Sequence, residues 1–90
     1  MSDIVARIRE RLAVLSPTAI DIQDDSALHA GHAGARAGGG HYRLHIVSAA
    51  FEGKSTVARH RLIYATLGDM MKKEIHALAI RAVSASEATK

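Results

Sequence analysis

The sequence predicts an α+β domain, a three-stranded mixed sheet with helices packed on one face in αββαβ order. Apolar residues recur at helical spacing over residues 3–15 and 55–67, and they alternate with polar residues over 19–24, 41–48 and 76–83. The helix before the last strand leaves room for a right-handed crossover, so the second and third strands are expected to be parallel. With 90 residues, the chain has room for one modest core.

The first helix and the first strand are predicted from their apolar spacing. The helix over 3–15 ends at Ser16, because a residue that precedes proline avoids the helical region. Its apolar stripe consists of Ile4, Ile8, Leu12 and Leu15. Over 19–24, Ile20 and Ile22 alternate with polar side chains, which is typical of a half-buried strand.

Residues 25–40 match no packed element, since they include five of the seven glycines. So long a connection in a small domain indicates a functional loop or disorder, and it is the first place to look for a site. It also joins two strands that follow each other, which suggests an antiparallel pair. His29 and His32 have the spacing of a metal-binding pair, but a closed zinc site needs four ligands, and two loop histidines are commonly just solvated.

The second half of the chain is predicted as strand, helix, strand. In 41–48, Tyr42, Leu44 and Ile46 share one face. Ser55 is placed to cap the following helix, whose apolar residues spread around the axis and so predict extensive burial. A short helical turn is expected over 69–74, and Leu78 and Ile80 share one face of the third strand. Residues 1–84 are thus assigned to one domain, and the polar residues 85–90 to a flexible tail.

Composition excludes several classes of protein. The chain has no Cys and six His, so it forms no disulfide scaffold, no Cys nucleophile and no iron–sulfur site built from its own thiolates. No apolar run is long enough to span a membrane, and the N-terminal segment lacks the apolar region of a signal peptide, so we expect a cytoplasmic protein. The net charge of +3 permits contact with nucleic acid without requiring it.

Three further features have an ordinary structural explanation. The G-K-S triplet at 53–55 resembles the end of a phosphate-binding loop, but the glycine needed five positions earlier is Ser48. Arg59 and Arg61 are placed to contact phosphates from a helix, although solvated arginines flanking a structural His60 fit the pattern as well. His76 stands alone at the start of a strand. No constellation of nucleophile and base appears, so no enzyme is predicted.

Several motifs together resemble the BolA family, from Ile4 to about Ser84. The order and spacing of F-x-G, R-H-R and I-H-A-L are more specific than any one of them. The matching stretches are D-S at 25–26, L-H-A-G-H at 28–32, G-H-Y-R-L-H-I-V-S at 40–48, F-E-G-K-S at 51–55, R-H-R-L-I-Y at 59–64 and I-H-A-L-A-I at 75–80.

The resemblance implies a fold like a type II KH domain and partnership with a monothiol glutaredoxin. Such pairs share a [2Fe-2S] cluster, for which the glutaredoxin supplies its active-site Cys and the thiol of a bound glutathione. The BolA-like chain supplies the His of I-H-A-L, here His76, and a second ligand from the loop between the first two strands. Here His29 matches best, with His32 as the alternative. The implied function is a non-enzymatic adaptor in iron–sulfur cluster trafficking or iron sensing.

The resemblance also implies a second class of function, since some family members are DNA-binding transcriptional regulators in stress and morphology responses. The corresponding helix-turn-helix-like segment is 51–67, and the candidate phosphate contacts are Lys54, Arg59 and Arg61. The resemblance is compatible with both functions in the same protein. It is also compatible with a homodimer of the free chain.

Overall fold

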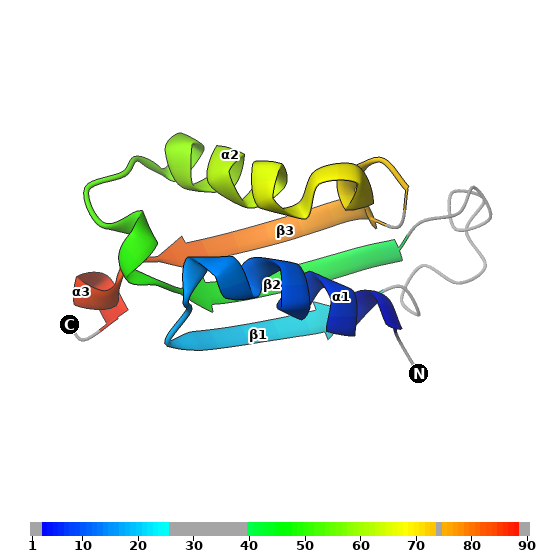
Figure 1. Ribbon diagram of the computed structural model, residues 1–90, viewed down its shortest axis with the longest axis horizontal. Coiled ribbons are helices and arrows are strands. Elements are labelled where there is room, and N and C mark those ends of the chain that lie inside the picture. Colours follow the sequence, from blue (N-terminus) through cyan, green and yellow to red (C-terminus); the bar gives the residue numbers. More distant parts are fainter. Residues whose placement is uncertain (1–2, 26–39, 74, 89–90) are drawn as a thin grey trace.

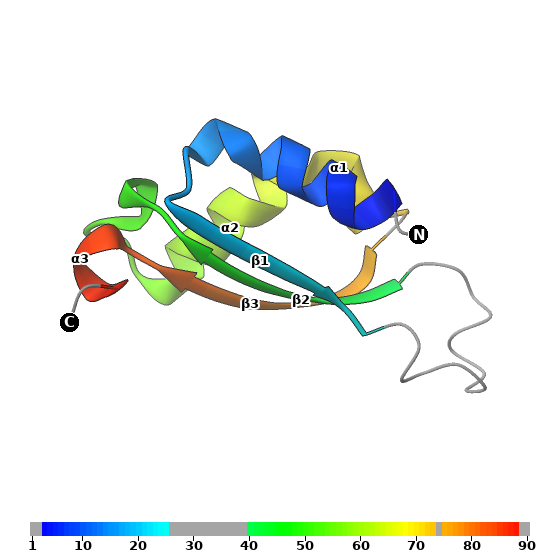
Figure 2. The ribbon, with the colours of Figure 1, turned by 90° about the horizontal axis from the view of Figure 1, so that it is seen from below.

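The computed structural model describes residues 3–25, 40–73 and 75–88. It contains a three-stranded sheet, and both long helices lie on the same face of it (Figures 1 and 2). The helices and strands are α1 (Asp3–Leu12), β1 (Ala19–Asp24), β2 (Gly40–Val47), α2 (Thr56–Leu67), β3 (Ile75–Val83) and α3 (Ala85–Ala88). The predicted fold class is confirmed. None of the helices described is both long and apolar enough to cross a membrane.

Strand β2 is the centre of the sheet, whose strand order is β1-β2-β3. It pairs antiparallel with β1, with Ala19 opposite Val47 and Asp24 opposite Tyr42. It pairs parallel with β3, through the crossover that α2 makes over the sheet. The mixed topology therefore follows the predicted order of elements.

The core lies between the sheet and the two long helices. The alternation predicted for β2 is confirmed, because Tyr42, Leu44 and Ile46 are buried while Arg43 and His45 are exposed on the opposite face. The other fully buried apolar side chains are Ile8 and Leu12 of α1, Ile63 and Leu67 of α2, and Phe51, Met70 and Ile75.

A hydrogen bond joins the C-terminal ends of α1 and α2. After α1 the chain continues as a 3-10 helix over Ala13–Leu15 and turns at Ser16, whose φ is 49°, before Pro17. The guanidinium of Arg11 donates a hydrogen bond of 2.7 Å to the Leu67 carbonyl at the end of α2. Arg11 thus ties the end of α1 to the end of α2.

Helix α2 differs from the extensive burial predicted for it. Val57 and Tyr64 are 59% and 41% exposed. Covering one face of a three-stranded sheet buries only the side of α2 that faces the strands. The remaining apolar side chains of α2 therefore stay in contact with solvent. The predicted turn after α2 is a 3-10 helix, Gly68–Met71.

Ser48 joins the end of β2 to three other segments. Its hydroxyl donates to the Leu15 carbonyl at 2.6 Å and accepts from the Ala50 N–H at 3.1 Å. Its own N–H donates to the Val83 carbonyl at the end of β3 at 3.0 Å. The side chain is completely buried, so these bonds replace all of its contacts with water.

Ser48→Ala is expected to lower the free energy of unfolding by about 1–3 kcal/mol, because buried polar groups at Leu15 and Ala50 lose their partner. Urea unfolding followed by far-UV circular dichroism measures the change. The control is Thr56→Ala, at an exposed position in the first turn of α2, for which the change should stay within about 0.5 kcal/mol. Equal losses in the two variants would contradict this role for Ser48.

Candidate functional site

His76 and a second histidine, His41, lie side by side at the end of the sheet where β2 and β3 begin. Their ring centroids are 5.1 Å apart and the ring planes meet at 48°. The His76 side chain is exposed and that of His41 is partly buried. We call these two residues the His41–His76 pair. The sequence motifs pointed to His76 but not to His41.

A register shift in the sheet brings the pair together. Gly40 lies opposite Ile75, but the next residue, His41, lies opposite Ala77, so His76 is an extra residue in β3. Such a bulge redirects side chains. Ile75 and Leu78 both pack into the core although an odd number of positions separates them, while His76 is exposed beside His41.

The predicted ligands His29 and His32 lie outside the described residues, so the choice between them stays a prediction. The described residues that flank their segment, Asp25 and Gly40, are at the same end of the sheet as the His41–His76 pair. The Asp25 N–H donates to the His41 carbonyl at 2.8 Å, and the Asp25 carboxylate forms a 2.8 Å ion pair with Arg43. No group of three metal-ligating side chains occurs among the residues that the structure describes.

The predicted DNA-contact segment, 51–67, begins at the opposite end of the sheet, and α2 runs back over the sheet toward the start of β3 (Figure 1). A 3-10 helix, Ala49–Phe51, leads into a turn at Gly53, whose φ of 72° lies in the left-handed region that favours glycine. Ser55 then caps α2, because its hydroxyl accepts from the Ala58 N–H at 3.2 Å. The G-K-S triplet is therefore a helix start, as its ordinary explanation predicts.

Two of the three candidate phosphate contacts are open to solvent. Lys54 is exposed on the turn and Arg61 is exposed on α2. His60, which lies between Arg59 and Arg61 in the sequence, is partly buried. Its ring meets that of Tyr64 edge-on, with 6.5 Å between the ring centroids.

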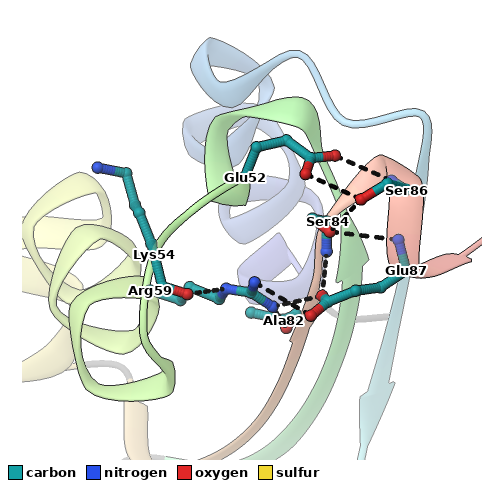
Figure 3. A network of polar contacts seen from close by, with 7 residues as sticks. All are labelled: Glu52, Lys54, Arg59, Ala82, Ser84, Ser86 and Glu87. Carbon is teal, nitrogen blue, oxygen red and sulfur yellow. Dashed lines mark hydrogen bonds and ion pairs between the residues drawn. The ribbon is translucent and has the colours of Figure 1, made fainter.

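Arg59 differs from the exposed Lys54 and Arg61 because its side chain is largely buried, with only 11% exposed. Its guanidinium donates to the Lys54 carbonyl at 2.9 Å, to the Ala82 carbonyl of β3 at 3.0 Å and to the Glu87 carboxylate at 2.6 Å (Figure 3). These bonds connect the start of α2, the end of β3 and α3. These bonds give Arg59 a structural role, and its contact with phosphates stays a prediction.

Residues 85–88, which belong to the segment predicted as a flexible tail from its polar composition, form helix α3. The Glu87 carboxylate also accepts from the Ser84 N–H at 2.9 Å, and Ser86 donates to Glu52 through its N–H and its hydroxyl, both at 2.9 Å (Figure 3). We call Glu52, Arg59, Ser84, Ser86 and Glu87 the C-terminal clasp. Glu52, which follows the Ala49–Phe51 3-10 helix, and Arg59 of α2 hold a helix that is too short to be stable alone.

Hydrogen bonds within the C-terminal clasp lower the pKa values of its two carboxyl groups, Glu52 and Glu87. Hydrogen bonds from Arg59, and then from the Ser84 N–H, lower the pKa of Glu87 from 4.5 to about 2. The hydrogen bonds that Ser86 donates through its N–H and its hydroxyl lower the pKa of Glu52. Both carboxylates are therefore charged at neutral pH, when the clasp is complete.

Comparison with known proteins identifies the family. The family model for BolA-like proteins matches residues 12–87. The chain belongs to the BolA-like family. Among solved structures, the BolA domain of SufE1 from Arabidopsis thaliana is 44% identical with a TM-score of 0.83, and the match covers 97% of this chain and 98% of that one. The core, the His41–His76 pair and the C-terminal clasp thus belong to a BolA-like fold.

Two curated relatives differ in size and in the role their names state. SufE-like protein 1 of Arabidopsis thaliana is 48% identical over 90% of this BolA-like chain, which spans 24% of that relative's length. A protein of Escherichia coli named DNA-binding transcriptional regulator BolA is 34% identical over 90% of this chain and 75% of its own length. The chain also spans about half of the length of BolA-like protein 1 of Homo sapiens. Membership of the family therefore leaves the function of this chain to be argued from its own residues.

Glu87→Gln is expected to lower the melting temperature at pH 7, because the Arg59 guanidinium loses its charged partner. A carboxyl group with a lowered pKa stabilises the fold above its ordinary pKa of 4.5, and this stabilisation is lost as the pH falls through the folded value of about 2. The difference between Glu87→Gln and wild type should thus shrink from pH 4.5 to pH 2. Melting curves at several pH values measure it.

The control for this experiment is Glu10→Gln, at an exposed position on α1. It should leave the melting temperature close to that of wild type at pH 7. If the deficit of Glu87→Gln were the same at pH 7 and pH 2, the ion pair with Arg59 would not be its cause.

Proposed function

We propose that this BolA-like chain is a non-enzymatic adaptor that shares a [2Fe-2S] cluster with a monothiol glutaredoxin, in cluster trafficking or iron sensing. The observation that carries the proposal is the exposed position of His76. The bulge in β3 turns this imidazole outward at the end of the sheet, while Ile75 and Leu78 anchor the strand on either side. A partner can therefore reach the His76 ring without any change in the core.

The donor set of the chain fits one half of such a cluster. Imidazole nitrogen is an established ligand for cluster iron, and His76 offers one on a rigid strand. With no Cys in the chain, thiolates have to come from the partner, as the glutaredoxin Cys and glutathione. A loop histidine, His29 or His32, is the second ligand that the family resemblance implies. Two imidazoles on one iron raise the reduction potential of the cluster.

His76→Ala is expected to change the visible circular dichroism of the complex with cluster-loaded glutaredoxin and to shorten the cluster lifetime at least about tenfold, since one iron loses a protein ligand. The control is His45→Ala, which removes an exposed histidine in the middle of β2. A His76→Ala complex with the wild-type spectrum and lifetime would show that His76 is not a ligand.

A second candidate function is binding of duplex DNA through segment 51–67. Two observations favour it: the Escherichia coli relative is named a DNA-binding transcriptional regulator, and Lys54 and Arg61 are exposed in that segment. Both side chains can approach phosphates, whereas Arg59 is held in the C-terminal clasp. Lys54 lies at the opposite end of the sheet from His76, and Arg61 lies further along α2, so substitutions at Lys54 and Arg61 leave the His76 imidazole in place.

Lys54→Ala and Arg61→Ala are each expected to weaken duplex binding and to reduce the salt slope of the affinity by about 1, because each removes one phosphate contact. Fluorescence anisotropy at several salt concentrations measures both quantities. Arg9→Ala is the matched control, since it removes an equal charge from the exposed face of α1. Equal effects of all three variants, or no binding at low salt, would contradict a site on 51–67.

A further inference from the structure

We propose that the Arg59 guanidinium is a latent phosphate-binding site for duplex DNA, and that helix α3 keeps this site closed by placing the Glu87 carboxylate where a phosphate would bind. Withdrawal of α3 then adds Arg59 to the exposed cations of segment 51–67. This inference rests on DNA binding, the second function proposed above, and makes the C-terminal clasp a gate on that function.

The Glu87 carboxylate is bound in the way that a phosphate is bound. Its two oxygens face the guanidinium of Arg59, with 2.6 Å from Nη1 to Oε1 and 3.3 Å from Nη2 to Oε2 (Figure 3). Arginine recognises carboxylate and phosphate oxygens through the same planar fork of N–H donors. The Ser84 N–H adds another donor, 2.9 Å from Oε1. The donors that hold Glu87 therefore suit a phosphate equally well.

Arg59 is held in position by bonds that do not involve α3. Its Nε donates to the Lys54 carbonyl at 2.9 Å, and its Nη1 donates to the Ala82 carbonyl of β3 at 3.0 Å. Both acceptors are backbone groups, one in the turn before α2 and the other in the sheet. A guanidinium that is fixed in this way loses little conformational entropy when it binds an anion. The site is thus built by α2 and the sheet, and α3 only occupies it.

The attachment of α3 permits its withdrawal. None of its residues, Ala85–Ala88, is buried, and the Glu87 side chain is 47% exposed. The bonds that hold the helix are polar, since Arg59 donates to Glu87 and Ser86 donates to Glu52. An ion pair whose carboxylate is this exposed is open to competing anions and is screened by salt. Because α3 contributes no side chain to the hydrophobic core, its withdrawal leaves the core intact.

The closed clasp also opposes DNA binding through its charge. Glu52 precedes the turn that carries Lys54, and Glu87 is bound to the arginine whose Nε contacts the carbonyl of that lysine. Both carboxylates are charged at neutral pH, because hydrogen bonds lower their pKa values. Negative charge beside Lys54 weakens the attraction of this turn for the phosphate backbone. Withdrawal of α3 removes the charge of Glu87 from the site and frees Arg59 at the same time.

A cycle of four chains tests the gate, by fluorescence anisotropy with a duplex DNA probe at several salt concentrations. The chains are wild type, Glu87→Ala, Arg59→Ala and the double variant. Glu87→Ala should bind about tenfold more tightly than wild type at about 50 mM salt and steepen the salt slope by about 1, since it gains one phosphate contact. Arg59→Ala should lower the affinity of the Glu87→Ala chain about tenfold, and that of wild type at most about twofold.

The control for the loss of charge is Glu10→Ala, which removes an equal charge from the exposed face of α1 and should bind within about twofold of wild type. Far-UV circular dichroism checks folding. If Arg59→Ala is unfolded, hydrogen exchange of the wild-type chain decides. The Ser86 N–H, bonded to Glu52 at 2.9 Å in the closed clasp, should exchange faster in the DNA complex than in the free chain.

Four results would overturn the gate and leave DNA binding by segment 51–67 intact. They are equal affinities of Glu87→Ala and wild type, a gain that persists when Arg59 is also replaced, an equal gain in Glu10→Ala, and unchanged or slower exchange of the Ser86 N–H in the complex. Absence of binding by every chain at low salt would overturn the proposed DNA-binding function, and the gate with it.

Discussion

The parallel pairing of β2 with β3 is the constraint on which the placement of every candidate residue depends. Parallel strands begin at the same end of a sheet, so His41 and His76 meet there although they are far apart in sequence. The strands also end together, which brings Ser48 within hydrogen-bond distance of Val83. Helix α2 makes this pairing possible, because a parallel connection has to cross over the sheet.

The two ends of the sheet consequently have different chemistry. One end presents the imidazoles of His41 and His76, and the other presents Lys54 on a turn that leads into α2. The C-terminal clasp fixes this second end, since Arg59 joins the first turn of α2 to β3 and α3. Because the Arg59 guanidinium is bonded within the fold, the exposed side chains of Lys54 and Arg61 are left to contact anions. The two proposed functions, cluster sharing and DNA binding, are therefore separable by substitution.

The sequence predicted those features that depend on local periodicity. The strand bounds agree within one residue, and the faces of β2 are as expected, because one-sided burial imposes a period of two. Helix α3 was missed because its four residues are too few to show a helical period, and its stability comes from Glu52 and Arg59, far away in the chain. The structural bonds of Arg59 were missed for the same reason, since its partners Ala82 and Glu87 are distant in sequence.

The position of His41 beside His76 was not predicted, because it depends on the register between strands. No local sequence pattern reports that register. In a regular strand that has Leu78 facing the core, His76 would also face the core and Ile75 would face solvent. One extra residue reverses both positions, so that the strand buries two apolar anchors of the I-H-A-L motif and exposes the histidine between them. The hydrophobic burial of Ile75 and Leu78 stabilises the bulge, and the bulge in turn holds His76 beside His41. The same register therefore determines both the burial of these core residues and the exposed position of His76.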